Sequence, residues 1–157
     1  MRKKIVKQSP EKESLAVQSG LDLVRLAQIE LTSEDQAHPI EAAFASIDGT
    51  GWVAAEPGEQ TIRLVFDEPQ QIKRIKLLFR EKEQARTQEF LLRWLPTGEK
   101  TYREIVRQQY NFSPPNSTEE SEDYAADLDA VCALELRILP DISGKSAFAS
   151  LAHMQVS

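Results

Sequence analysis

The stretch TIRLVFDEPQQIKRIKLLFR, residues 61–80, alternates apolar and polar side chains over two consecutive segments. The apolar positions are Ile62, Leu64 and Phe66 in the first segment and Ile75, Leu77 and Phe79 in the second. A period of two is typical of a β-strand with one face in the core and the other in water. The stretch therefore predicts two strands, the first of which is closed by Pro69.

The same period recurs along the chain, at residues 88–94, 101–112, 131–140 and 151–156. The expected inward positions are Phe90, Leu92 and Trp94, followed by Leu134, Leu136 and Ile138. Only residues 39–45 have a helical pattern, and residues 113–129 resemble a long acidic loop because they are rich in Ser, Pro, Glu and Asp. Many short strands without alternating long helices predict an all-β fold, an antiparallel β-sandwich.

A chain of 157 residues has the usual length of one compact domain, which we expect at residues 21–157 after a mobile, polar arm at residues 1–20. The basic start lacks the apolar segment of a secretory signal, and no apolar run is long enough to span a membrane. The single cysteine, Cys132, cannot form a disulfide within the chain. These features predict a cytoplasmic protein with no membrane partner, unless a removed signal peptide once preceded it.

Charge is unevenly distributed around a formal net value of −6, which argues against nucleic-acid binding. Residues 71–110 are basic and the flanking regions are acidic. The expected outward basic side chains are Arg63, Arg74, Lys76, Arg93, Arg103 and Arg107. Two interpretations follow: a positive patch that docks an acidic protein, or sheet faces neutralised by partners such as Glu89, Glu104 and the acidic stretch at 119–129.

In the order of its elements, the sequence resembles the discoidin, or coagulation factor 5/8 type C, family of galactose-binding-domain-like jelly rolls. The resemblance covers roughly residues 24–157. It rests on AAFASIDGTGW, TIRLVFDEPQQIKRIKLLF, RTQEFLLRW, and ALELRILP followed by ASLAHMQV. It implies a jelly-roll β-sandwich that recognises sugars, phospholipid surfaces or proteins through loops at one end, since catalysis is unusual in the family.

The resemblance also implies a ligand site. Sugar-binding relatives hydrogen-bond sugar hydroxyls with a His and an Arg at places that correspond to His38 and Arg80, usually with an Asn beyond the Arg. Here Gln84 stands in place of that Asn, and no aromatic stacking residue is evident in the sequence. The alternative interpretation makes His38 an exposed loop residue and Arg80 a solvated strand end.

Asp48 and Trp52 carry the two remaining family features. The resemblance places a structural calcium at Asp48, but the DGTG turn is short and the last strand offers His153 and Gln155 where an acidic ligand is expected. We therefore expect no cofactor, with Asp48 capping its own turn. Trp52 is expected to plug one end of the core rather than to stack on a sugar.

The sequence contains no metal-ligand spacing, phosphate loop or nucleophile elbow, so we expect no enzymatic activity. The function expected from these observations is a recognition module that binds a saccharide around His38, Arg80 and Gln84. The rival hypothesis is a cytoplasmic interaction subunit that docks a protein through the basic strand face or the acidic 113–129 loop.

Overall fold

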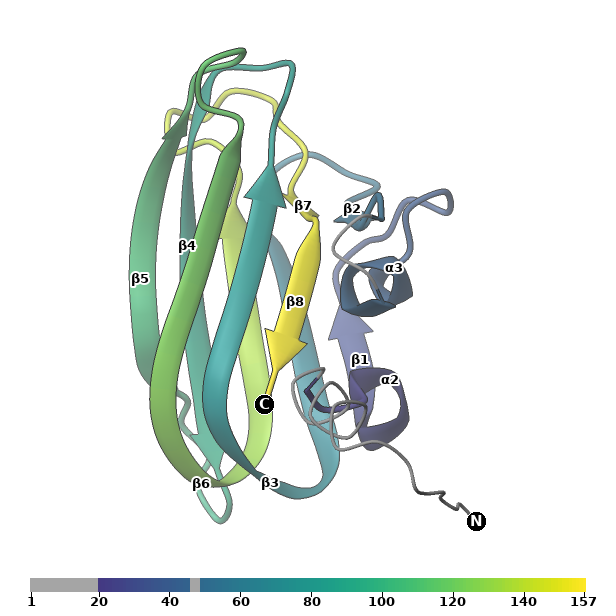
Figure 1. Ribbon diagram of the computed structural model, residues 1–157, viewed down its shortest axis with the longest axis vertical. Helices are drawn as coiled ribbons and strands as arrows, with labels where there is room; N and C mark the ends of the chain where they lie inside the picture. The colour runs from purple at the N-terminus through teal and green to yellow at the C-terminus, as the bar shows by residue number, and fades with distance from the viewer. Residues whose placement is uncertain (1–19, 46–48) are drawn as a thin grey trace, which may run out of the picture.

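The computed structural model describes residues 20–45 and 49–157, which form a β-sandwich with two short helices at one side (Figure 1). The elements are α2 (Leu23–Leu26), β1 (Ala27–Leu31), α3 (Ile40–Ala45), β2 (Trp52–Val53), β3 (Gln60–Arg80), β4 (Arg86–Pro96), β5 (Arg103–Phe112), β6 (Glu119–Leu139), β7 (Ser150–Leu151) and β8 (His153–Val156). The predicted all-β sandwich is confirmed. The predicted arm at residues 1–20 falls almost wholly outside the described residues.

Two long strands, β3 and β6, pair antiparallel and bend together, so that each contributes to both layers of the sandwich (Figure 1). Their first register joins residues 60–65 to 133–138, and their second joins residues 74–80 to 119–125. Register shifts between Val65 and Arg74 mark the bend, because an irregular ladder lets a strand turn sharply. The sequence predicted two strands here, and Pro69 lies in the bend between the two halves of one.

The back layer contains β1, the first half of β3, the second half of β6, β4 and β5, all antiparallel. The front layer contains the first half of β6, the second half of β3, and β8. A separate pair, β2 with β7, lies at the upper edge of the sandwich, where β2 is close to α3 (Figure 1).

Apolar side chains from both layers meet in one core, and the predicted inward positions are confirmed with one exception. The confirmed residues are Ile62, Leu64, Phe66, Ile75, Leu77, Phe79, Phe90, Leu92, Leu134, Leu136 and Ile138. Trp94 is only half-buried and lies under the guanidinium of Arg103. Trp52 is fully buried and its Nε1 donates to the Ser33 carbonyl at 3.1 Å, which confirms that it plugs the end of the core.

The predicted acidic loop at residues 113–129 is wrong from Glu119 onward, where β6 begins. Glu120 and Tyr124 face the interior while Ser121 and Asp123 are exposed, so the strand has a normal period of two. The sequence concealed the strand because its inward positions carry carboxylates instead of apolar side chains. Only the segment from Ser113 to Thr118 remains a turn.

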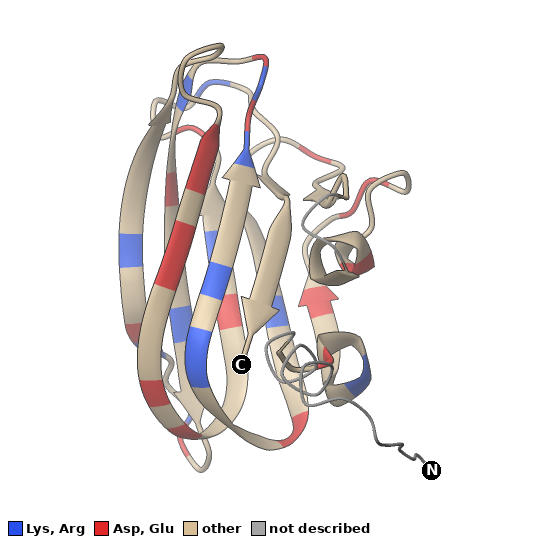
Figure 2. Ribbon diagram, viewed as in Figure 1, with Lys and Arg blue, Asp and Glu red and all other residues tan. Residues whose placement is uncertain are grey.

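Basic and acidic residues lie on neighbouring strands (Figure 2), and every expected outward basic side chain except Lys76 forms an ion pair within the described residues. Arg63 and Arg93 both bond to Glu135 in the back layer. The other pairs are Arg74 with Asp123, Arg103 with Glu99, and Arg107 with Glu89. The structure favours the interpretation of neutralised sheet faces over a single positive patch.

No helix in the described ranges is long and apolar enough to cross a membrane.

Candidate functional site

The end of β3 and the loop that joins it to β4 carry two of the three predicted ligand-binding residues. Arg80 is the last residue of β3, and its Nε donates to Glu119 Oε2 at 2.9 Å across the β3–β6 pair. The Gln84 backbone N–H donates to Glu81 Oε2 at 3.1 Å, and its side-chain Nε2 donates to the Ser146 carbonyl at 3.4 Å. The structure therefore places Arg80 and Gln84 at one end of the sandwich, and their role in ligand binding stays a prediction.

An exposed aromatic side chain, Phe148, belongs to the same end and was missed by the sequence analysis. It lies between Ser146, which accepts from Gln84, and Ser150, whose Oγ is 3.5 Å from the Arg80 carbonyl. Its exposed fraction is 48%, whereas the flanking alanines at 147 and 149 are buried. The sequence does contain a signal for this exposure: in an alternating segment, Ala147 and Ala149 share one face, so if the alanines face the core then Phe148 must face outward.

His38 lies at the same end but on the other side of the β2–β7 pair. The Val53 N–H donates to the His38 carbonyl, Val53 pairs with Ser150, and Ser150 contacts Arg80. This series of contacts links His38 to Arg80 across the β2–β7 pair. Nδ1 of His38 is 2.7 Å from Asp35 Oδ2, and this hydrogen bond lowers the pKa of Asp35. His38 is thus oriented by Asp35 and is only half-buried.

The loop residues are held from below by Arg86, the first residue of β4. Its side chain is 1% exposed, and its Nε donates to Glu81 Oε1 at 2.7 Å while its Nη1 donates to the Pro140 carbonyl at 2.7 Å. The first bond fixes the loop that carries Gln84. The second fixes the start of the loop that carries Phe148, so one buried guanidinium positions both sides of the candidate site.

Asp48 lies outside the described residues, so the absence of calcium there stays a prediction. Within residues 20–45 and 49–157, no group of three or more His, Cys, Asp or Glu side chains could hold a metal ion. Gly51, which follows in the same loop, has a φ of 73°, and a Cβ there would meet the Leu151 carbonyl at 2.4 Å. Only glycine fits this approach of the loop to β7.

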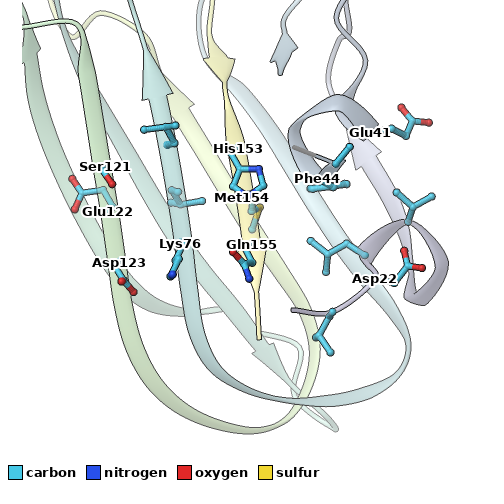
Figure 3. Close-up of a pocket in the computed structure, with 16 residues that line it drawn as sticks. Asp22, Glu41, Phe44, Lys76, Ser121, Glu122, Asp123, His153, Met154 and Gln155 are labelled. Atoms are coloured by element: carbon cyan, nitrogen blue, oxygen red, sulfur yellow. The ribbon is translucent and has the colours of Figure 1, made fainter. Parts of the chain in front are cut away.

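A groove lies elsewhere, on the outer face of the front layer (Figure 3). It has a volume of about 800 Å³ and runs between the two helices and strands β8, β3 and β6. Phe44, Lys76 and His153 contribute to its lining, whereas His38, Arg80 and Gln84 do not. Burial lowers the pKa of His153, since a charged ring would be poorly solvated there.

The chain has the galactose-binding-domain-like fold, because it is similar to solved structures with this fold over most of the length of both chains. No protein-family model matches the sequence. No curated protein matches it either.

The family 32 carbohydrate-binding module of Clostridium perfringens NanJ, solved in complex with galactose, has a TM-score of 0.59 and 15% identity, covering 83% of this chain and 92% of that one. A second module from the same organism, CpGH89CBM32-5, was solved with GalNAc-β-1,3-galactose and has a TM-score of 0.60 and 18% identity, covering 83% and 94%. XRCC1 bound to the DNA polymerase β catalytic domain is also similar, with a TM-score of 0.58 and 13% identity over 84% and 95%.

Proposed function

We propose that this protein is a non-enzymatic carbohydrate-recognition module that binds a galactose-type saccharide at the loop end of the sandwich. The observation that carries the proposal is that the segment of the exposed Phe148 contacts both other residues. Gln84 Nε2 donates to the Ser146 carbonyl, and Ser150 Oγ lies 3.5 Å from the Arg80 carbonyl. An exposed ring supplies an apolar platform for one face of a sugar, and the neighbouring guanidinium and amide supply hydrogen bonds to its hydroxyls. His38, oriented by Asp35, contributes at the far side of the same end.

The solved structures of carbohydrate-binding modules with galactose and with GalNAc-β-1,3-galactose support this ligand class. The likeness to XRCC1 bound to a polymerase supports the rival class, protein docking. However, the two surfaces that the sequence predicted for docking differ from the expectation: the basic strand face is neutralised by acidic partners, and most of the acidic loop is a strand.

We extend the proposal to a reducing, cytoplasmic location, because half-buried Cys132 has no disulfide partner in the described part of the chain.

To test the proposal, the intact chain and two site variants are titrated by calorimetry with galactose and with GalNAc-β-1,3-galactose. Phe148→Ala should abolish measurable binding because the stacking platform is removed. Arg80→Ala should weaken binding at least tenfold, about 1.4 kcal/mol, since it loses charge-assisted hydrogen bonds to the sugar.

Each variant has a matched control in this chain. Val24→Ala removes an exposed apolar side chain of similar exposure on α2, away from the loop end. Arg74→Ala removes an ion pair between the same two strands as Arg80–Glu119. Binding that survives Phe148→Ala, or that is lost equally in the controls, would remove the loop end from consideration.

A further inference from the structure

Glu120 and Glu122 occupy neighbouring inward positions of β6, where Glu120 is buried and Glu122 is half-buried. Glu120 is 2% exposed, and its Oε2 has no hydrogen-bond donor among the residues that the structure describes. The carboxyl of Glu122 is within hydrogen-bonding reach of it, and Tyr124 donates to Glu122 Oε1 at 2.8 Å. Two ionised carboxylates are both acceptors, so this contact requires a shared proton.

Burial, reinforced by the hydrogen bond and the like charge of Glu122, raises the pKa of Glu120 to about 8. The charged and titratable groups that interact with it are Glu122 and Tyr124 from the same strand and Arg86 from β4. On the β3 side, its cross-strand partner is the apolar Phe79. The pair therefore holds a proton at neutral pH.

A chain of side-chain hydrogen bonds links this pair to the loop end. Gln88 Nε2 donates to Glu120 Oε1 at 3.2 Å, and Gln88 Oε1 accepts from Arg86 Nη1 at 3.2 Å. Arg86 in turn holds Glu81 and the Pro140 carbonyl, which position the loops of Gln84 and Phe148. A single amide thus separates the buried carboxyl from the guanidinium that fixes both loops.

We propose that the protonation of the Glu120–Glu122 pair controls the position of the two ligand-binding loops through Gln88 and Arg86. With the pair protonated, Arg86 is engaged by Glu81 and Pro140 and the loops are held as observed. When the proton leaves, Glu120 becomes a buried anion one amide away from Arg86, whose Nη2 is buried without an acceptor in the described residues. The attraction draws the guanidinium toward Glu120 and away from the loops.

This inference rests on the proposed function for its consequence, which is saccharide binding that weakens at alkaline pH. Couplings between two sites commonly change affinity by a factor of five or more. We expect galactose affinity to fall by about fivefold or more between pH 6.5 and pH 9. Glu120→Gln, which keeps the side chain neutral, should bind equally at both pH values.

The decisive measurement does not need a sugar. In the ¹³C-labelled intact chain, the carboxyl carbon of Glu120, the Cζ of Arg86 and the ring carbons of Phe148 are followed by NMR from pH 6 to pH 9.5. We expect all three to titrate together with a midpoint near 8. In Glu120→Gln the response of Arg86 and Phe148 should vanish, and in the control Asp123→Asn, an exposed carboxylate of the same strand, it should persist.

The outcomes separate the two proposals. If Glu120 titrates while Arg86 and Phe148 stay constant, or if Glu120→Gln retains the response of the ring, the coupling is refuted whatever the protein binds. If galactose binds at neither pH but the three signals move together, the saccharide proposal fails and the coupling of the loops to the pair stands.

Discussion

Glu120→Gln should change how the stability of the protein depends on pH. In the unfolded chain this carboxyl has its ordinary pKa of 4.5, whereas burial and Glu122 raise it to about 8 in the folded protein. Below 4.5 both states hold the proton. Between 4.5 and 8 the unfolded chain releases it and the fold retains it, so rising pH favours unfolding, and above 8 the effect is complete.

The slope for one proton is about 1.4 kcal/mol of unfolding free energy per pH unit, so the carboxyl costs about 2.7 kcal/mol between pH 5 and pH 7. Gln at position 120 is neutral in both states and carries no such cost. We therefore expect the stability of Glu120→Gln relative to the parent to rise by about that amount over these two units.

Urea unfolding monitored by Trp fluorescence at pH 5, 6 and 7 measures this difference directly. Titrating groups that do not interact with Glu120, such as Glu135, cancel in the comparison because both proteins contain them in the same surroundings. Asp123→Asn serves as the control, since Asp123 is exposed and its ion pair with Arg74 is a surface one. Parallel curves for the parent and Glu120→Gln would refute the buried, protonated carboxyl.

Three further substitutions test the packing that positions the site. Trp52→Ala should cost about 3–5 kcal/mol of unfolding free energy because it empties the end of the core and removes the hydrogen bond to Ser33. A neutral Trp52→Ala in urea melts would show that the ring is not a plug. Gly51→Ala should destabilise by more than about 1 kcal/mol because of its positive φ and the Leu151 carbonyl, and an unchanged Tm would contradict the close approach. Burial opposes the ionisation of Glu135, but hydrogen bonds from Arg63 and Arg93 outweigh burial and lower the pKa of this carboxyl. The stability that ionised Glu135 contributes should therefore be lost as pH falls through that lowered pKa. Glu135→Gln should remove this part of the acid sensitivity, and an acid unfolding transition identical to the parent's would argue against the ion pairs.

The strands whose inward positions are apolar could be predicted from the sequence, since Ile62, Leu64 and Phe66 show the period of two without ambiguity. The first half of β6 could not. Its inward positions are Glu120, Glu122 and Tyr124, which remove the apolar signal and give the segment the composition of a loop. A polar interior at this point is explained by the partners Gln88 and Arg86, which come from a distant part of the sequence.

The candidate site was predictable only in part, for a similar reason. Arg80 and Gln84 are close in sequence, and their proximity in space follows from the strand and its loop. Phe148 is more than 60 residues away, and it joins them because β7 and the Ser146 carbonyl contact the β3–β4 region. Such contacts depend on the closure of the sandwich, which no local pattern encodes.

The central claim is that a saccharide binds at the loop end, and the most direct test is NMR mapping of galactose on the ¹⁵N-labelled intact chain at pH 6.5. We predict saturable shifts in the amides of residues 81–85 and 145–149, with Phe148 among the largest. No shifts at all, or shifts confined to the groove around Phe44 and His153, would contradict it.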